Sequence, residues 1–249
     1  MINFKNKVVL VTGVSSGIGK DCVKRFLEDG ATVVGTLRKN AAMFDSLKKE
    51  YPGKLHIMYL DVTNRTQVQA VLEETIEKMG HIDVLVNNAG VHANNILTET
   101  PEEQWDLLFN ANVKSIYHMC YYAIPYMQKQ KDGVVINIAS RVGTVGSPKS
   151  AAYCASKAAV INLTREMALD YASDHIRINA VSPGMVETPM VDRQFDGDLL
   201  RKKATIEMYP LKRFAISEDV VNVVEFLASD GAAYLTGINI PVDGGRSAI

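Results

Sequence analysis

The sequence predicts an α/β fold with a doubly wound parallel sheet of about seven strands and helices on both faces. Short apolar runs alternate with helical stretches along the whole chain, which is typical of strands joined by crossover helices. The runs are almost continuously apolar, as expected when helices cover both faces of a sheet. The chain has 249 residues, 47% of them hydrophobic, and neither a linker nor a repeat divides it, so we expect one domain over residues 1–249.

The first half of the chain holds four of the expected strands and three helices. The strands are expected at Val8–Thr12, Thr32–Leu37, Leu55–Leu60 and Val84–Asn87. The helices between them are expected at Gly17–Asp29, Ala41–Glu50 and Thr66–Met79. Each strand is therefore followed by a helix that returns the chain to the start of the next strand.

The second half continues the alternation with longer helices. A helical region is expected at Pro101–Gln130, followed by a strand at Val134–Ile138, a helix at Ala151–Tyr171 and a strand at Ile176–Val181. A variable segment, Met185–Pro210, comes before a helix at Glu218–Ala228 and a last strand at Ile238–Val242. The variable segment interrupts an otherwise regular pattern.

Composition and charge exclude several classes of protein. The formal net charge is −1, which gives no general attraction to nucleic acid or to an anionic membrane. The three cysteines, Cys22, Cys120 and Cys154, form no disulfide framework and indicate a reducing compartment. The first strand begins too early for a signal peptide, and no apolar run has membrane-spanning length, so we expect a cytoplasmic protein. The five histidines show no metal-ligand spacing, and no metal is expected.

A glycine-rich stretch lies between the first strand and the first helix. It reads TGVSSGIG, from Thr12 to Gly19. A loop at this place brings backbone N–H groups and a helix N-terminus together, which suits an anionic phosphate. The spacing is Gly13, Gly17, Gly19 and not the common GxGxxG.

A tyrosine and a lysine stand four residues apart in YCASK, Tyr153 to Lys157. With 10 Tyr and 27 Lys and Arg among 249 residues, about one tyrosine with a cation four positions later is expected by chance. The chain has two such pairs, Tyr153/Lys157 and Tyr209/Arg213. The motif alone is therefore weak evidence, and it needs partners elsewhere in the chain.

Several ordered motifs together give the sequence a specific resemblance. The loop Thr12–Gly19 matches TGxxxGxG, NNAG at Asn87–Gly90 ends the fourth strand, and Pro183–Gly184 precedes Thr188. In this the chain resembles the short-chain dehydrogenase/reductase family, in its single-domain branch, from Lys7 to the C-terminal VDGG. The resemblance implies a Rossmann-type dinucleotide-binding oxidoreductase domain.

The resemblance implies a catalytic tetrad of Asn112, Ser140, Tyr153 and Lys157. Reduction of a ketone needs a proton donor within hydrogen-bond reach of the carbonyl oxygen. Because a lysine at i+4 lies on the same helix face, its charge should lower the pKa of Tyr153 from about 10. Ser140 can hold the substrate oxygen. In the family, Lys157 would also hold the nicotinamide ribose and, through Asn112 and water, feed a proton relay.

The end of the second strand favours NADP(H) as the cofactor. An acid at this place binds the 2′-hydroxyl of NAD, whereas an arginine accommodates the 2′-phosphate of NADP. The segment VVGTLRKN contains no acid, and Arg38 and Lys39 stand where the phosphate would lie. Ser16 occupies a loop position where many NADP-preferring relatives carry a second cation. The expected cofactor contacts are Gly13, Ser15, Ser16, Gly17, Ile18, Gly19, Arg38, Lys39, Asp61, Val62, Asn88, Ala89, Gly90, Tyr153, Lys157, Pro183, Gly184, Val186 and Thr188.

The substrate is less determined than the reaction. We expect the segment 185–210 to form a lid that carries specificity. Its apolar residues and the basic run Arg201–Lys203 suit a bulky apolar ketone with an acidic tail, such as a hydroxysteroid or bile acid, and equally a solvated helix. A 3-oxoacyl thioester on an acyl carrier is the alternative, and a catalytically idle NADP-binding regulatory protein is another. The expected substrate contacts are Ser140, Tyr153, His92, Val142, Met185 and Met190, although His92 also suits an exposed loop.

The helical stretch SIYHMCYYAIPYM, Ser115 to Met127, is apolar on nearly all its faces. A helix that is apolar all round is usually buried all round. The resembled family commonly forms homotetramers through this helix and the one bearing Tyr153. We therefore expect a homotetramer, with cover by the chain's own segments as the alternative.

Overall fold

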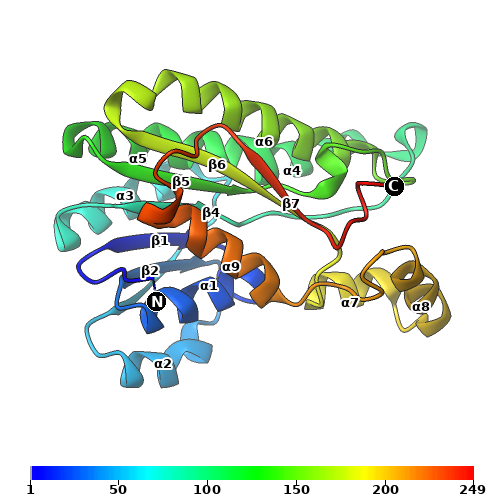
Figure 1. Cartoon of the computed structure of the whole chain (residues 1–249), viewed down its shortest axis with the longest axis horizontal. Helices are drawn as coiled ribbons and strands as arrows, with labels where there is room; N and C mark the ends of the chain where they lie inside the picture. The colour runs from blue at the N-terminus through cyan, green and yellow to red at the C-terminus, as the bar shows by residue number, and fades with distance from the viewer. Residues whose placement is uncertain (1) are drawn as a thin grey trace.

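The computed structural model describes residues 2–249, and seven strands form one parallel sheet in the order β3-β2-β1-β4-β5-β6-β7. The strands are β1 Val8–Thr12, β2 Thr32–Leu37, β3 Leu55–Tyr59, β4 Val84–Asn87, β5 Gly133–Ile138, β6 Ile176–Pro183 and β7 Asn239–Val242. The predicted sheet of about seven strands is confirmed (Figure 1).

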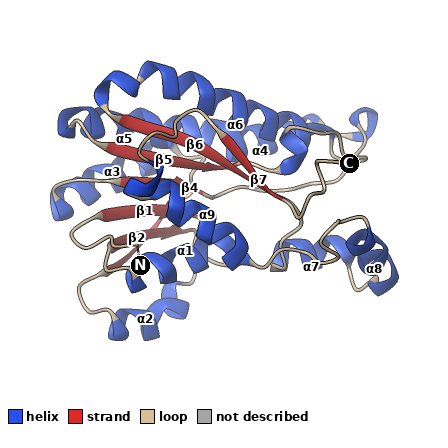
Figure 2. Cartoon of the chain, in the orientation of Figure 1, coloured by secondary structure: helices blue, strands red, loops and turns tan. Residues whose placement is uncertain are grey.

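Helices cover both faces of the sheet, as Figure 2 shows. They are α1 Gly17–Glu28, α2 Asp45–Glu50, α3 Arg65–Met79, α4 Glu102–Phe109, α5 Ser115–Gln130, α6 Ala151–Asp170, α7 Pro189–Phe195, α8 Leu199–Glu207 and α9 Ser217–Ala228. One core lies between the sheet and helices α1 and α9, and includes Phe26 and Val224. The other lies between the sheet and helices α3, α5 and α6, and includes Leu72, Met119 and Val160. The strands are therefore buried on both faces, which explains their continuous apolar runs.

The strand order reverses beside β1, which pairs with β2 on one side and with β4 on the other. The chain after β1 thus turns to one side of the sheet, and the chain after β4 turns to the other. A crevice opens at such a switch point, outside the carboxyl ends of the strands. The motifs TGVSSGIG and NNAG follow β1 and β4, so both lie at this crevice.

The predicted helical region at Pro101–Gln130 is confirmed, and it is helical from Glu102 to Gln130. A π-helical segment, Asn110–Lys114, joins α4 to α5. Single π turns inside helices often mark functional sites, and this one carries Asn112. The sequence pattern did not indicate the π turn, because a widened turn keeps helical composition and leaves no break in the pattern.

The segment 185–210 forms two short helices, α7 and α8, at one end of the molecule (Figure 1). Three of its residues, Val191, Phe195 and Tyr209, form a small apolar core together with Phe214 from the chain just after it. The segment is therefore folded, and it is attached beside the crevice. Within residues 2–249 no helix is both long and apolar enough to cross a membrane.

Candidate active site

The glycine loop adopts a backbone that side chains would not permit. Gly13 and Gly17 have φ of +71° and +55°, in the left-handed region. A Cβ on Gly13 would lie 2.8 Å from the Cα of Ala89, and a Cβ on Gly19 would lie 2.5 Å from the carbonyl oxygen of Gly13. Helix α1 begins at Gly17, and Ser16 makes no capping hydrogen bond through its side chain. The first N–H groups of α1 thus keep their capacity to bind a phosphate, and the loop fits a dinucleotide.

The NNAG motif braces this loop from the other side of the crevice. Thr12 Oγ1 accepts hydrogen bonds from the backbone N–H groups of Asn88 and Ala89, both at 3.0 Å. The Asn88 side chain donates to the carbonyl oxygens of Thr12 at 2.9 Å and Gly13 at 3.0 Å. The two motifs therefore form one hydrogen-bonded unit, which fixes the path of the loop.

A cleft of about 710 Å³ runs along the carboxyl ends of the strands. The expected cofactor residues that line it are Gly13, Ser15, Ser16, Gly17, Ile18, Arg38, Asp61, Val62, Asn88, Ala89, Gly90, Tyr153, Lys157, Pro183, Gly184, Val186 and Thr188. The expected substrate residues His92, Ser140, Val142, Tyr153, Met185 and Met190 line it as well. Three expected residues do not: Gly19 lies beneath the loop, Asn112 is buried behind the cleft, and Lys39 is exposed outside it.

Ser140, Tyr153 and Lys157 meet in the middle of this cleft. Ser140 follows β5, whereas Tyr153 and Lys157 lie one turn apart on α6. Lys157 Nζ lies 5.8 Å from the centre of the Tyr153 ring and donates a 2.8 Å hydrogen bond to the carbonyl oxygen of Ile138. The fold thus unites two segments that are separate in sequence, as the resemblance implied.

Burial decides the pKa values of the pair in this cofactor-free chain. It raises the pKa of Tyr153 to about 12, although a hydrogen bond with Ser140 acts in the opposite direction. It lowers the pKa of Lys157 to about 8. Desolvation is thus the largest influence on the Tyr153 pKa in this state, and its lowering by Lys157 stays a prediction.

Asn112 is engaged in a structural network. Its Oδ1 accepts from the N–H of Val91 at 2.8 Å, and its Nδ2 donates to the Val91 carbonyl at 3.0 Å and to Ser156 Oγ at 3.1 Å. Ser156 in turn donates to the carbonyl oxygen of Tyr153 at 2.8 Å. Asn112 thereby ties the chain after NNAG to the π turn and to α6. A part in a proton relay stays a prediction.

Ser156 is a residue that the sequence interpretation missed, although it lies inside YCASK. Its signal was its place three residues after Tyr153, which allows its hydroxyl to reach back to that carbonyl. His92 was left open between loop surface and substrate contact. Its ring packs edge-on against Tyr153 with centroids 4.6 Å apart, and burial lowers its pKa. The lowered pKa favours a neutral imidazole beside Tyr153.

Arg38 lies at the end of β2, exposed and lining the cleft. Asp61 is nearby, and its pKa is lowered by hydrogen bonds from Thr63, with a smaller contribution from the charge of Arg38. Asp61 is the one carboxylate among the described residues that line the cleft. No acid from β2 competes with a phosphate at Arg38.

The segment 185–210 contributes to the cleft through α7 and the residues before it. Thr188 packs over the glycine loop, since a Cβ on Gly17 would lie 2.8 Å from its methyl group. The basic run Arg201–Lys203 lies on α8, outside the cleft, with the Arg201 guanidinium 5.4 Å from the centre of the Phe195 ring. The suggestion that this run binds an acidic tail is therefore not supported. Cleft residues that we did not expect include Leu107, Arg141, Ser147, Val191, Arg193 and Gln194.

Comparison with known proteins shows the family to which this chain belongs. Residues 13–247 match the model of a family described as Enoyl-(Acyl carrier protein) reductase. The chain belongs to the short-chain dehydrogenase/reductase family. It is 42% identical to the 3-oxoacyl-[acyl-carrier-protein] reductase FabG of Thermotoga maritima, over 98% of this chain and 99% of the relative. It is 39% identical to the meso-2,3-butanediol dehydrogenase of Serratia marcescens, over 99% of this chain and 97% of the relative.

A solved structure extends the match to three dimensions. The structure described as ElxO with NADP bound superposes with a TM-score of 0.93 and is 33% identical, covering 98% of this chain and 99% of that one. The family fold is thus present here over nearly the whole chain.

Proposed function

We propose that this chain is an NADP(H)-dependent oxidoreductase that interconverts a ketone and a secondary alcohol. The observation that carries the proposal is that Ser140, Tyr153 and Lys157 line the same cleft as the glycine loop and Arg38. One wall of the cleft fits a dinucleotide phosphate, and the middle holds a half-buried phenol that can donate a proton. The bound nicotinamide cofactor supplies or accepts the hydride.

Residues of the cleft bind the substrate oxygen, donate the proton and contact the cofactor ribose. Ser140 and Tyr153 hold the carbonyl oxygen, and Tyr153 gives it a proton as the carbon is reduced. With a pKa of about 12, Tyr153 is protonated at neutral pH, which suits the direction of ketone reduction. Lys157, with a pKa of about 8, is mostly charged at pH 7 and lies within reach of the ribose side of the cleft. A regulatory protein without catalytic activity would not need Ser140, Tyr153 and Lys157 together in this cleft.

The proposal is tested with purified protein and NADPH against acetoacetyl thioesters, oxo-steroids, oxo-bile acids and small diketones. NADPH consumption with at least one ketone, absent in Tyr153→Phe, is the expected result. Normal NADPH binding without turnover of any ketone would instead favour the regulatory protein.

A 3-oxoacyl thioester is the second candidate for the substrate, beside the hydroxysteroid or bile acid. The 42% identity to an acyl-carrier reductase over almost the whole chain favours it. The apolar lining from Leu107, Val142, Met185 and Met190 suits both kinds of substrate. Comparison of an acetoacetyl thioester with an oxo-steroid in the same assay separates the two.

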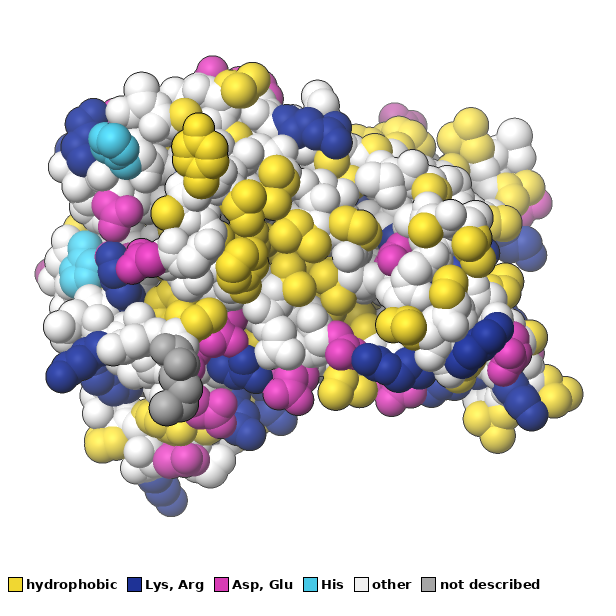
Figure 3. Space-filling model, viewed as in Figure 1, with side chains coloured by type: hydrophobic (Ala, Val, Ile, Leu, Met, Phe, Trp, Pro, Cys, Tyr) yellow, Lys and Arg dark blue, Asp and Glu magenta, His cyan; other side chains and the backbone are white. Residues whose placement is uncertain are grey.

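We also propose a homotetramer, as the apolar helix suggested. Tyr117 and Tyr121 on α5 and Leu169 on α6 are exposed, so the chain does not cover this side itself. Apolar side chains also gather on the face shown in Figure 3, over the region of α9 and β7, where Phe226 and Tyr234 are exposed. Two separate apolar surfaces allow a closed tetramer. Light scattering at micromolar concentration tests it, and a monomer mass would refute it.

A further inference from the structure

The charges of the cleft are unevenly distributed. Arg38, Arg141, Lys157 and Arg193 line it, against the single described carboxylate Asp61. Asp61 accepts two hydrogen bonds from Thr63 and belongs to the Arg38 end. Arg141 and Arg193 therefore meet no carboxylate among the described residues that line the cleft, apart from Asp61 at the Arg38 end.

Arg141 has no proposed contact with the cofactor. Arg38 is assigned to the 2′-phosphate, and the N-terminus of α1 to the phosphates that link the two nucleotides. Lys157 is bound to the carbonyl of Ile138. Arg141 as a whole residue is half-buried, and its side chain has no hydrogen bond or ion pair with any side chain or carbonyl of residues 2–249. An arginine that lines a cleft without a partner among the described residues suits an anionic ligand, because its planar guanidinium matches a carboxylate or a phosphate.

The backbone of Arg141 is fixed against the catalytic residues. Ser140 accepts a hydrogen bond from the N–H of Val142 at 3.4 Å, and its carbonyl accepts from Gly143 at 2.9 Å. A Cβ on Gly143 would lie 2.8 Å from the carbonyl oxygen of Lys157, so this turn is pressed onto α6. The guanidinium is thus carried by a rigid turn that begins at the residue holding the substrate oxygen.

From this arrangement we infer that the ketone substrate carries an anionic group, a carboxylate or a phosphate, which Arg141 binds while Ser140 and Tyr153 hold the ketone oxygen. The inference rests on the proposed function and deepens it. Arg141 directly follows Ser140 in the chain and lines the same cleft, so one substrate molecule can contact both residues. The planar guanidinium suits the two oxygens of such a group. Arg193 on α7 adds a second positive charge from the segment 185–210.

The experiment compares matched ketones that differ in charge. The kcat/KM with NADPH is measured for 3-oxobutanoate and 4-oxopentanoate against their methyl esters, and for dihydroxyacetone phosphate against dihydroxyacetone. In the wild-type protein the charged member of at least one pair is expected to be preferred by about 10- to 150-fold, the range of a hydrogen bond to a charged group. The pair that shows the preference identifies the anion as carboxylate or phosphate.

Two variants and a control connect the preference to Arg141. Arg141→Leu is expected to lose most of the ratio between charged and neutral substrate, and Arg141→Lys to retain part of it. Lys149→Met is the matched control, because Lys149 is exposed, lies in the same loop and does not line the cleft. It is expected to keep the ratio within about 2-fold, since an exposed charge is screened by solvent. NADPH binding to each variant checks that the fold is retained.

The outcomes separate this inference from the proposed function. Turnover of neutral ketones with no preference for any charged partner would overturn the inference and leave the proposed function standing. Equal loss with charged and neutral ketones in Arg141→Leu would also overturn it, because Arg141 would then only support the Ser140 turn. If no ketone is turned over, both the proposed function and this inference are refuted.

Discussion

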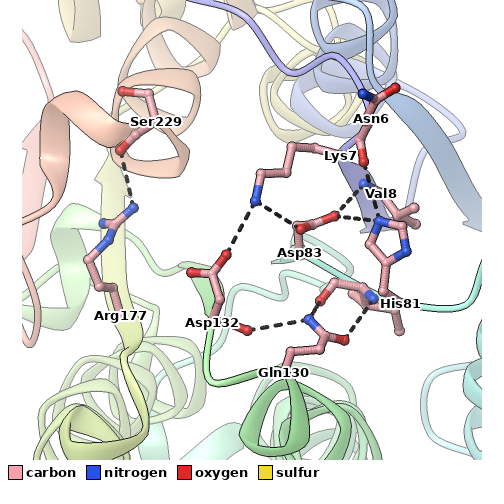
Figure 4. Close-up of polar contacts among 10 residues, drawn as sticks. Asn6, Lys7, Val8, His81, Asp83, Gln130, Asp132, Arg177 and Ser229 are labelled. Atoms are coloured by element: carbon pink, nitrogen blue, oxygen red, sulfur yellow. Dashed lines mark hydrogen bonds and ion pairs between the residues drawn. The ribbon is translucent and has the colours of Figure 1, made fainter.

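Two lysines at opposite ends of the strands of the same sheet have pKa values that are shifted in opposite directions. At the amino ends of the strands, Lys7 donates to Asp83 at 3.0 Å and to Asp132 at 3.2 Å, and Asp83 also accepts from the N–H of Val8 at 2.7 Å (Figure 4). Although burial acts against the charge, these contacts raise the pKa of Lys7. At the carboxyl ends, Lys157 has no carboxylate partner among residues 2–249, and burial lowers its pKa to about 8.

The difference indicates that polar groups at the amino ends of the strands stabilise the fold, whereas those at the carboxyl ends are available to bind a ligand. The network in Figure 4 also includes Gln130, whose amide donates to the carbonyl of Ile82 at 3.0 Å, so polar groups at the amino edge satisfy one another. At the carboxyl edge the cations and the first N–H groups of α1 keep capacity for a ligand. Substitutions at the two edges should therefore change different quantities.

The largest effect is expected from Tyr153→Phe. The variant keeps the ring but loses the proton donor, so kcat should fall by about 10²- to 10⁴-fold while NADPH affinity changes little. Steady-state kinetics and an NADPH titration measure the two quantities. Tyr234→Phe, at a fully exposed tyrosine, is the control and should keep wild-type rates. A variant at position 153 with more than about a tenth of the wild-type kcat would contradict the role of Tyr153.

The pH dependence of stability should change in Lys157→Met. The folded-state pKa of about 8 lies below the ordinary value of 10.5, so the unfolded chain binds more protons between these values. The buried charge therefore costs stability below about pH 8, and the cost is relieved as pH rises toward 10.5. The variant lacks this cost, so its free energy of unfolding relative to wild type should be more favourable at pH 7 than at pH 10, by on the order of 3 kcal/mol.

Urea unfolding of the cofactor-free proteins at the two pH values measures this difference. Lys20→Met, at an exposed lysine on α1, should show no such difference. An equal stability difference at both pH values would mean that Lys157 is not held at a lowered pKa. Lys157→Met should also reduce NADPH affinity and turnover, because the proposed roles of Lys157 involve the ribose and Tyr153.

Cofactor choice is expected to depend on Arg38. The wild-type protein should prefer NADPH over NADH by at least about 10-fold in kcat/KM, mostly through KM, because a hydrogen bond to a charged group is worth about 1.5–3 kcal/mol. The double substitution Leu37→Asp with Arg38→Leu should abolish or reverse the preference, since the acid repels phosphate and accepts from the 2′-hydroxyl. Lys39→Met should have little effect, because Lys39 does not line the cleft. Comparable kcat/KM values for the two cofactors in the wild type would refute the role of Arg38.

The smallest effect is expected at the amino edge. Asp83→Asn keeps the shape but removes the charge that pairs with Lys7, and it should lower the free energy of unfolding by about 1 kcal/mol, since Lys7 is substantially solvated. Turnover should stay within about 2-fold of wild type, because this edge holds no part of the cleft. Urea unfolding and steady-state kinetics check both. A large loss of kcat without loss of stability would erase the distinction between the two edges.

The sequence by itself determined the order of strands and helices and the places of the motifs. Apolar runs are local, and their period and length are set by burial on both faces of the sheet. The glycine loop could also be predicted, because Gly13 and Gly17 need backbone angles that other residues rarely adopt. Ser140, Tyr153 and Lys157 were named through family motifs, and the fold brought all three to one cleft.

Only the tertiary structure decided the environment of those side chains. The pKa of Tyr153 depends on how many atoms exclude water from it, and this number is a sum over segments that are distant in sequence. The π turn at Asn112, the packing of His92 on Tyr153 and the exclusion of Arg201–Lys203 from the cleft depend on the same three-dimensional packing. Arg141 was visible beside Ser140 from the start, but its lack of a partner could be seen only when every neighbour had been placed.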